Sequence, residues 1–301
     1  MREPGRLITA MATPFCPDGS LDLDGTARLA RHLVETGTEC VVVSGTTGES
    51  PTLSHDEKLT LLDVVLGAVG DRIPVMMGTG TNSTSDSVTL TREAHQHGAG
   101  AALLVVPYYN KPTQEGLFQH FSTIAGATPI PVMLYNVPSR TVADLLPETV
   151  VRLSGVPNIF AVKEASGQVA RTAEILSQAR AGFRVYSGDD SLTLPILSLG
   201  GYGVVSVLAN LSGEPLRAMI DAYLQGRPTV ATEIHLAILP LLKALFITAN
   251  PIPLKSALGM LGLPAGVPRL PLVSATPSEE AVIRKALDCL KIRFCADLAA
   301  S

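Results

Sequence analysis

The feature that most constrains the fold of this chain is a regular alternation between short apolar runs and helix-like segments. Eight apolar runs of strand length recur at intervals of roughly 20 to 35 residues. The runs are Leu7–Ala12, Cys40–Ser44, Pro74–Gly78, Ala101–Val106, Pro131–Tyr135, Ile159–Lys163, Phe183–Ser187 and Gly203–Val207. Segments with a helical period lie between them, among them Leu23–Thr36, Asp56–Val69 and Ser83–His97. This alternation predicts a parallel sheet whose strands are joined by helices.

The number of units distinguishes a closed barrel from an open sheet. Eight strand–helix units within about 225 residues are typical of an α/β protein with a (β/α)8 barrel. A doubly wound open sheet is the alternative, but no GxGxxG motif opens a helix after the first apolar run. We therefore predict the barrel, and we do not expect a dinucleotide-binding domain.

The pattern changes after Leu224, where apolar runs no longer alternate with helices. The rest of the chain contains three helix-like segments, Pro228–Thr248, Ile252–Leu261 and Ser278–Lys291. A proline-rich break separates the first two of them. We predict a barrel domain over residues 1–225 and a C-terminal domain of three helices over residues 226–301.

Composition excludes several classes of partner. The 301 residues are 46% hydrophobic, with a mean hydropathy of +0.30 and a net charge of -4. No basic block is present, so we expect no nucleic acid partner, and no apolar run could span a membrane. The polar N-terminus has no apolar signal core, which favours a cytoplasmic protein. Cys16, Cys40, Cys289 and Cys295 are scattered without metal-binding spacing, so we expect reduced thiols and no metal.

One lysine stands out because it ends an apolar run. In the segment Ile159–Ala165, four apolar residues lead directly into Lys163. Lysine is rarely buried without a partner, so a lysine at the end of a strand that is buried on both faces needs a reason. The ordinary reason is that its side chain extends to water. The chemical reason is a desolvated amine that attacks a carbonyl carbon and forms a Schiff base.

Polar and aromatic groups follow several other runs, and the active site of a (β/α)8 barrel lies at the C-terminal ends of its strands. The second run is followed by GTTGES (Gly45–Ser50), a turn whose backbone N–H groups and hydroxyls can hold a carboxylate. PYYNKP (Pro107–Pro112) follows the fourth run, YNVPSRT (Tyr135–Thr141) marks the end of the fifth, and SGDD (Ser187–Asp190) ends the seventh. Taken singly, each segment is also compatible with an ordinary turn.

Together, these motifs resemble one family. GTTGES, PYYNKP, YNVPSRT, VKEASG and SGDDSLTLP, in this order and spacing, are similar to the dihydrodipicolinate synthases. That family belongs to the pyruvate-dependent class I aldolases, together with the N-acetylneuraminate lyases. The resemblance covers essentially the whole chain and includes ITANPIPLK in the helical region. It implies a lyase that condenses pyruvate with L-aspartate-4-semialdehyde through a lysine Schiff base, giving 4-hydroxytetrahydrodipicolinate for diaminopimelate and lysine biosynthesis.

The resemblance also implies a set of catalytic residues. Lys163 would form the Schiff base, and Tyr135 would transfer protons beside it. Thr47 would connect Tyr135 to Tyr109, which in this family reaches in from the neighbouring subunit. Hydroxyl groups suit such a relay because each can donate and accept. The protonated imine is the electron sink, so no cofactor is expected.

The expected substrate contacts come from the same motifs. Thr46 and Thr47 would hold the pyruvate carboxylate, and Gly188 and Val205 would line the pocket with backbone groups. Arg140 would bind the carboxylate of the aldehyde substrate with its planar guanidinium. The neuraminate lyases lack this arginine, so Arg140 favours a short acidic aldehyde over a long sugar.

Two alternatives to this function stay open at the level of sequence. Another pyruvate-dependent aldolase would act on 4-hydroxy-2-oxoglutarate or a 2-keto-3-deoxy sugar acid, and a non-catalytic family member would bind a small keto acid. The intact set of Lys163, Tyr135, Tyr109 and Thr47 argues against a pure binding protein, which needs no proton relay. A tyrosine supplied by a neighbour implies at least a dimer, and the family suggests a homotetramer built as a dimer of dimers.

The family also suggests a regulatory site for lysine at the tight dimer interface. The matching positions are Ser50, Pro51, His55, Lys58, Asn82, Asp86 and Tyr108. Strongly lysine-sensitive members carry histidine in place of Lys58 and glutamate in place of Asp86. The charge of Lys58 would repel a cationic ligand, and the Asp86 carboxylate is one methylene shorter. We therefore expect weak or absent inhibition by lysine.

Overall fold

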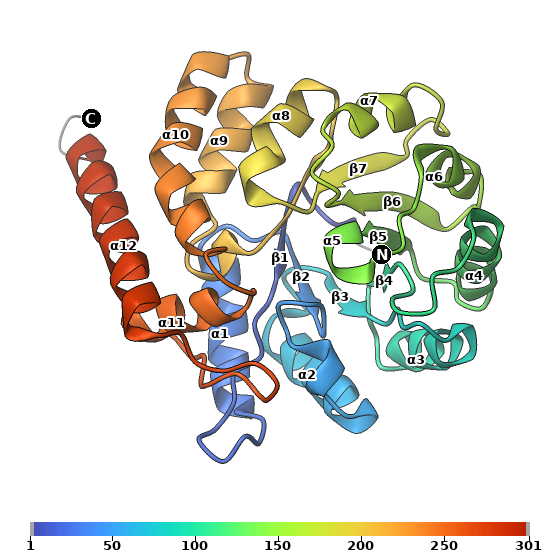
Figure 1. Cartoon of the computed structure of the whole chain (residues 1–301), viewed down its shortest axis with the longest axis horizontal. Helices are drawn as coiled ribbons and strands as arrows, with labels where there is room; N and C mark the ends of the chain where they lie inside the picture. Colours follow the sequence, from blue (N-terminus) through green and yellow to red (C-terminus); the bar gives the residue numbers. More distant parts are fainter. Residues whose placement is uncertain (1–2, 299–301) are drawn as a thin grey trace.

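The computed structural model describes residues 3–298 and contains a closed barrel of eight parallel strands in chain order (Figure 1). The strands are β1 (Leu7–Ala10), β2 (Cys40–Val43), β3 (Val75–Gly78), β4 (Ala101–Val105), β5 (Val132–Asn136), β6 (Ile159–Glu164), β7 (Arg184–Ser187) and β8 (Gly203–Ser206). β1 pairs with both β2 and β8, which closes the sheet and leaves no edge strand in the barrel. Each strand coincides with one of the predicted apolar runs, so the prediction of a (β/α)8 barrel is confirmed.

Helices cover the outside of the barrel (Figure 1). The longer elements are α1 (Leu23–Glu35), α2 (His55–Val69), α3 (Thr84–Gln96), α4 (Gln114–Gly126), α6 (Pro147–Ser154), α7 (Ala170–Leu176), α8 (Thr193–Ser198) and α9 (Glu214–Leu224). Shorter helical turns lie in the loops: η1 (Ser50–Thr52), α5 (Pro138–Thr141), η2 (Asp190–Leu192) and η3 (Leu208–Asn210). Polar side-chain caps mark the start of α1 to α4; for example, Ser54 and Glu57 form a reciprocal capping box at the start of α2.

The barrel has two apolar layers, one on each face of its strands. The outer layer packs the strands against the helices, and the inner layer fills the barrel. The inner layer includes Tyr135 of β5, Ala161 of β6 and Val205 of β8. Side chains alternate between the two faces along a strand, so Lys163, two residues after Ala161, also points inward. The sheet register places Lys163 directly beside Tyr135.

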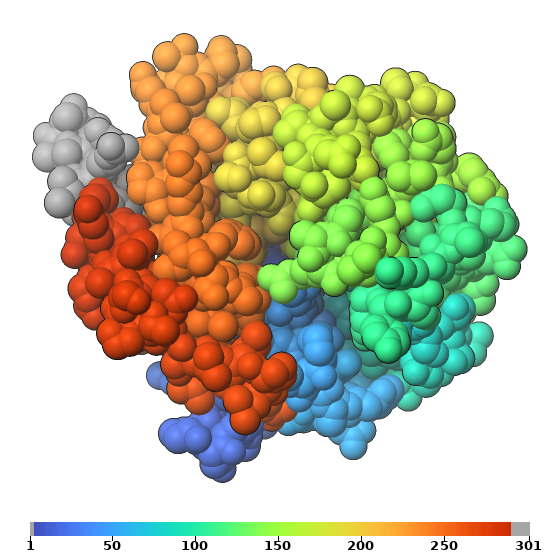
Figure 2. Space-filling view, viewed as in Figure 1, coloured from blue at the N-terminus to red at the C-terminus, as the bar shows by residue number. Residues whose placement is uncertain are grey.

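Three further helices follow the barrel within the described residues: α10 (Pro228–Ala244), α11 (Ile252–Met260) and α12 (Pro277–Leu298). α10 packs against both α9 and α12, and Figure 2 shows this part of the chain, orange to red, against one side of the barrel. The segment between α10 and α12 returns to the barrel, where Lys255 pairs with Glu49 and Arg269 pairs with Glu57. In residues 3–298, no helix is both long enough and apolar enough to cross a membrane.

Candidate active site

Lys163 lies inside the barrel at the C-terminal end of β6, and only 5% of its surface is exposed. Its Nζ atom lies 4.1 Å from the centroid of the Tyr135 ring. The electron-rich face of that ring attracts a cation at Nζ. Within residues 3–298, no carboxylate pairs with Lys163 and no hydrogen bond to its amine is found. The amine is therefore enclosed beside a phenol without being committed to a structural contact.

Gly188, directly after β7, makes room for this lysine. A Cβ atom on Gly188 would lie 2.6 Å from Ala165 Cβ and 3.1 Å from both Cγ and Cε of Lys163. Close-packed interiors do not absorb such contacts, so any larger residue would displace the lysine. The Gly188 N–H also donates to the carbonyl of Glu164 over 2.7 Å and ties the ends of β6 and β7 together. Gly188 thus shapes the space around the amine.

A cavity of about 400 Å³ lies at the C-terminal ends of strands β2 to β5. This volume is within the range of small-molecule sites. The predicted catalytic and substrate-binding residues in its wall are Thr46, Tyr135 and Arg140. Those outside the wall are Lys163, Thr47, Tyr109, Gly188 and Val205. Lys163 adjoins the cavity through the Tyr135 ring, and Val205 lies in the inner apolar layer with Tyr135.

The GTTGES loop after β2 is held by residues from near the end of the chain. Asn250 Nδ2 donates to Thr47 Oγ1 over 3.0 Å, and both residues are buried. Glu49 has a φ of 56°, a left-handed conformation that is uncommon for residues other than glycine. Its carboxylate pairs with Lys255 Nζ at 2.5 Å and accepts the backbone N–H of Arg269 over 2.9 Å. The position of Thr47 therefore depends on a residue 203 positions later in the chain.

Arg140 lies on α5, the short helix that follows β5. Its Nη2 atom donates to the carbonyl oxygen of Asn250 over 3.3 Å. Asn250 therefore contacts both Thr47 and Arg140, which the motifs at the strand ends do not predict. The available signal was its place in ITANPIPLK, a segment that carries the family resemblance but follows no strand.

Tyr109 lies apart from Lys163 within a single chain. Its side chain is 90% exposed, and its φ of 74° is strained for a bulky residue. Strained, exposed aromatic residues are typical of contacts made outside the chain that carries them. In the described residues, no hydrogen bond joins Thr47 to Tyr135 or Tyr109. The hydroxyl relay and the supply of Tyr109 by a neighbouring subunit stay predictions.

The positions matched to a lysine site fall into two groups. Those in the wall of the cavity are Ser50, Pro51, Lys58 and Tyr108. Those outside the wall are His55, Asn82 and Asp86. His55 Nε2 pairs instead with Glu93 Oε2 on α3 at 2.6 Å. Burial lowers the pKa of Lys58, which makes no ion pair or hydrogen bond in the described part of the chain.

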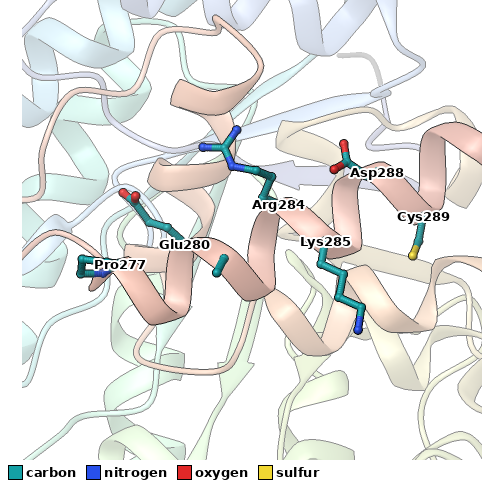
Figure 3. Close-up of a pocket in the computed structure, with 7 residues that line it drawn as sticks. Pro277, Glu280, Arg284, Lys285, Asp288 and Cys289 are labelled. Carbon is teal, nitrogen blue, oxygen red and sulfur yellow. The ribbon is translucent and has the colours of Figure 1, made fainter.

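A second depression, of about 500 Å³, lies along α12 (Figure 3). Its side chains Glu280, Arg284, Lys285 and Asp288 carry charges of both signs along a single helix. None of the predicted catalytic residues lines this depression. Among residues 3–298, no group of three or more His, Cys, Asp or Glu is arranged to hold a metal ion.

An enclosed amine beside a phenol, at the carboxyl end of a barrel strand, is suited to Schiff-base chemistry. The amine can add to a ketone, and the protonated imine then withdraws electrons from the neighbouring carbon. The Arg140 guanidinium in the cavity wall suits an acidic substrate. Fold and site together therefore define a lyase of the class I aldolase type.

Comparison with known proteins identifies the family. Residues 3–290 match the dihydrodipicolinate synthetase family, and this chain belongs to that family. The 4-hydroxy-tetrahydrodipicolinate synthase of Moorella thermoacetica is 56% identical over 283 residues, which cover 94% of this chain and 97% of the relative. The protein of the same name from Thermosynechococcus vestitus is 51% identical over 291 residues, with coverage of 96% and 98%.

Solved structures of relatives share the architecture. A dihydrodipicolinate synthase from Bacillus anthracis is 44% identical, with a TM-score of 0.93 and coverage of 96% of this chain and 99% of that chain. The enzyme from Cyanidioschyzon merolae, solved with lysine bound, is 45% identical, with a TM-score of 0.94 and coverage of 96% and 98%. The family resemblance predicted from the motifs is confirmed, and the chain is an enzyme rather than a keto-acid-binding protein.

Proposed function

We propose that this chain condenses pyruvate with L-aspartate-4-semialdehyde to give 4-hydroxytetrahydrodipicolinate, in diaminopimelate and lysine biosynthesis. The observation that carries the proposal is the enclosed Lys163 amine, 4.1 Å from the Tyr135 ring centroid, with Arg140 in the wall of the adjoining cavity. The relative from Moorella thermoacetica, which carries the name of this activity, is 56% identical and supports the same substrates here.

The chemistry starts at the Lys163 amine, which adds to the ketone carbon of pyruvate and, with loss of water, forms a protonated imine. The imine withdraws electrons, so the methyl carbon loses a proton and becomes an enamine nucleophile. That carbon then attacks the aldehyde carbon of the second substrate and forms the new carbon–carbon bond, while the aldehyde oxygen takes up a proton. The amino group of the second substrate then attacks the imine carbon, which closes the ring, breaks the bond to Lys163 and restores the free amine. The phenol of Tyr135, whose ring lies beside Nζ, can donate or accept the protons of these steps.

The remaining residues act on binding and on the space around the amine. Thr46 and Thr47 hold the pyruvate carboxylate, because their loop presents hydroxyls and backbone N–H groups after β2. Arg140 binds the carboxylate of the aldehyde substrate. Gly188 keeps the space that Lys163 needs, and Val205 of β8 packs in the same inner apolar layer as Tyr135.

We propose that Tyr109 completes the site of a neighbouring subunit, in a homotetramer made of two dimers. Its 90% exposed side chain supports a contact outside its own chain. Mixing inactive Tyr109→Phe subunits with inactive Lys163→Ala subunits tests this assembly, because each hybrid dimer would contain one complete site. Recovered activity in verified hybrids is the expected result, and no recovery would assign Tyr109 to its own chain or to no role.

The proposed function is tested by following each substrate separately. Borohydride reduction in the presence of pyruvate should attach one pyruvate-derived group to Lys163, detected by peptide mass spectrometry. A coupled assay with a panel of aldehydes should then show turnover with aspartate-4-semialdehyde. Turnover with a keto-sugar acid or 4-hydroxy-2-oxoglutarate instead would show that the chain is a different pyruvate aldolase.

Arg140→Ala separates the two substrates in the same assays. The adduct should still form, because Arg140 is not needed for pyruvate to reach the amine. Turnover with aspartate-4-semialdehyde should fall roughly 30- to 4,000-fold, as expected for the loss of a charge-assisted contact worth about 2–5 kcal/mol. An unchanged kcat/KM would remove Arg140 from the substrate site.

Two further properties belong to the proposal. We place the division between the barrel and the helical domain at residues 225 and 226, between α9 and α10, and we expect the protein in the cytoplasm. Limited proteolysis tests the division, because a boundary there should be cut before the barrel is. Fractionation of the cells that make the protein tests its location.

A further inference from the structure

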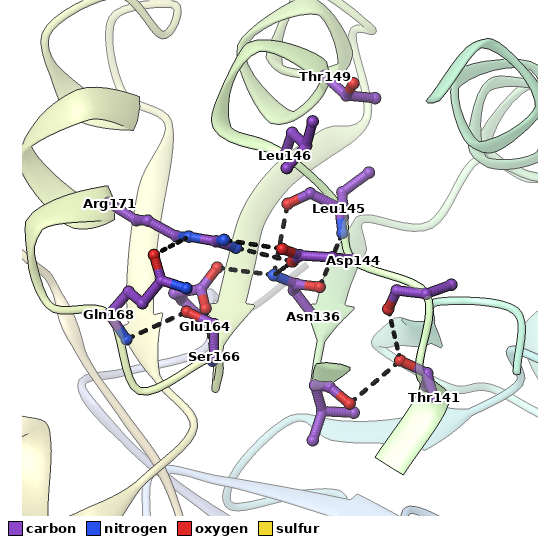
Figure 4. A network of polar contacts seen from close by, with 12 residues as sticks. Asn136, Thr141, Asp144, Leu145, Leu146, Thr149, Glu164, Ser166, Gln168 and Arg171 are labelled. Carbon is purple, nitrogen blue, oxygen red and sulfur yellow. Dashed lines mark hydrogen bonds and ion pairs between the residues drawn. The ribbon is translucent and has the colours of Figure 1, made fainter. Parts of the chain in front are cut away.

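A cluster of buried polar side chains, including Asn136 and Glu164, lies at the ends of β5 and β6 (Figure 4). Asn136 and Glu164 are the next residues along β5 and β6, and the sheet register pairs them with each other. They are 0% and 3% exposed. Because side chains alternate along a strand, these two point outward where Tyr135 and Lys163 point inward. The cluster and the proposed catalytic pair therefore share the same two strand ends.

Asn136 uses both ends of its amide. Its Nδ2 group donates to Glu164 Oε2 and to Asp144 Oδ1, each over 3.1 Å, and its Oδ1 accepts the Leu145 N–H over 3.0 Å. Glu164 Oε1 accepts the Ser166 N–H over 2.6 Å, which closes the turn just after Lys163. A side chain that must donate on one side and accept on the other can be asparagine but not aspartate or leucine.

An ion pair holds the outer side of this cluster. Arg171 on α7 binds both carboxylate oxygens of Asp144 over 2.7 Å and donates from Nε to Gln168 over 3.2 Å. The Arg171 guanidinium lowers the pKa of Asp144, so the carboxylate stays charged and fixed against Asn136. Two-pronged pairs of this kind add directional specificity as well as energy. Figure 4 shows the arginine and the Asn136 amide both reaching the same carboxylate.

The cluster also holds the loop that follows Arg140. Leu145 and Asp144 lie in the segment between α5, which carries Arg140, and α6. The Leu145 N–H and the Asp144 carboxylate both bind Asn136, so this loop is attached to the end of β5. One asparagine therefore connects three parts of the site: the strand of Tyr135, the strand of Lys163 and the loop beyond Arg140.

We propose that Asn136 and Glu164 are positioning residues that hold the Lys163 amine against Tyr135, with the Asp144–Arg171 pair holding Asn136 in its orientation. The inference rests on the proposed function, because it assumes that Lys163 is the reacting amine. A shift of the β6 end relative to β5 moves Nζ away from the ring, and a misplacement of about 1 Å can cost on the order of 100-fold in rate. None of these four side chains touches the cavity that takes the substrate.

Glu164→Gln is the sharpest single change, because it preserves shape and turns one acceptor into a donor. The new amide N–H group meets the Asn136 N–H group, and relieving that conflict breaks a contact to Ser166, Leu145 or Asp144. The measurement is the time course of the pyruvate adduct on Lys163, quenched with borohydride at increasing times. We expect the rate of adduct formation to fall roughly 10- to 100-fold while the final amplitude stays complete. A population of unfolded chains would lower the amplitude instead.

An exchange variant provides the rescue. Asn136→Asp combined with Glu164→Gln and Asp144→Asn restores a donor facing an acceptor at both of these contacts of position 136, with both directions reversed. The adduct rate should return to within about tenfold of the wild type, above that of Glu164→Gln alone. If the single variants fold poorly, Asp144→Asn keeps the test open, because Asp144 is only part-buried and its loss should slow the adduct about fivefold.

Thr38→Val is the matched control. It removes a buried hydrogen bond of 2.6 Å between Thr38 and Thr9, on strands and loops away from β5 and β6. We expect a lower melting midpoint with an unchanged adduct rate. A rate within twofold of wild type in Glu164→Gln, at a stability as low as that of the control, would show that the cluster only supports the fold. Absence of any adduct on wild-type Lys163 would instead contradict the proposed function.

Discussion

Two lysines of this chain are buried to nearly the same extent but have opposite surroundings. Lys163 is 5% exposed and Lys255 is 3% exposed, and each amine lies 4.1 Å from the centroid of an aromatic ring, Tyr135 or Phe15. Lys255 Nζ also pairs with Glu49 at 2.5 Å and donates to the Val267 carbonyl over 3.3 Å. Lys163 has neither kind of contact in the described residues.

The difference shows that burial alone does not distinguish a lysine held in an ion pair from one whose amine is unpaired. An amine that is paired with a buried carboxylate serves to hold two segments together, and removing one partner leaves the other charge uncompensated. An amine without such a partner can be used by a substrate. Burial lowers the pKa of Lys255. The Glu49 carboxylate opposes this shift, because it stabilises the charged form of the amine.

The largest expected effect is the loss of turnover in the Lys163→Ala variant. Turnover should fall by roughly 10,000-fold or more, because no other group supplies the imine. The free energy of unfolding should change by less than about 1 kcal/mol, since no ion pair is broken and a buried amine is removed. Steady-state kinetics and urea denaturation measure the two quantities. Adduct formation at Lys111 or Lys243 in this variant would show that the wrong lysine has been assigned.

Lys255→Met should have the opposite effects, a large loss of stability with the pyruvate adduct still formed. It leaves the Glu49 carboxylate buried without a cation, so the free energy of unfolding should fall by about 3–5 kcal/mol. The folded fraction should still form the pyruvate adduct. The double variant Glu49→Leu/Lys255→Met should recover much of the stability, because replacing both charges removes the uncompensated one. A loss below about 1 kcal/mol in the single variant would mean that water reaches the pair.

The partly exposed ion pair between Arg269 and Glu57 contributes a smaller, pH-dependent part of the free energy of unfolding. Hydrogen bonding to Arg269 is the main cause that lowers the pKa of Glu57 to about 2, from an ordinary value of 4.5. The folded pKa is depressed, so the stabilisation is full above about pH 4.5 and is lost as the pH falls towards 2. Glu57→Gln should lower the free energy of unfolding by about 1–2 kcal/mol at neutral pH. Denaturation curves of both proteins should converge at low pH; a constant difference would exclude the ion pair as its cause.

The smallest expected effect concerns a third amine, that of Lys58. This amine lines the cavity without a partner in the described residues and would repel a bound lysine by about 1 kcal/mol. We propose that free lysine inhibits this chain weakly or not at all, and that Lys58→His makes inhibition several-fold stronger. Initial rates with increasing lysine test this. Strong inhibition of the wild type would show that His55, Asn82 and Tyr108 suffice for binding.

The fold was predictable because each strand of a parallel barrel is buried on both faces. That double burial turns strands such as β2 and β6 into continuous apolar runs, which are visible without any partner strand. Short elements were less predictable: α5 and η1 have too few residues to show a period and are defined by proline and the surrounding loop.

The candidate site was predictable to the extent that topology determines it. Lys163, Tyr135 and Gly188 end strands or follow them, and a barrel brings all strand ends to one face. Asn250 and the Glu49–Lys255 pair could not be derived this way, because they arise where a distant segment packs on a loop. The contact between His55 and Glu93 could not be predicted from the sequence either, because it depends on how α2 and α3 pack.

The hydrogen bond between Asn250 and Thr47 joins residues 203 positions apart, and this has a consequence for how the protein is made. A ribosome releases the loop after β2 long before it adds Asn250, Lys255 and Arg269. Until then, Glu49 has no cation and Thr47 lacks the amide that orients it. A nascent or prematurely terminated chain that lacks these residues therefore has neither the amide that binds Thr47 nor the cation that pairs with Glu49.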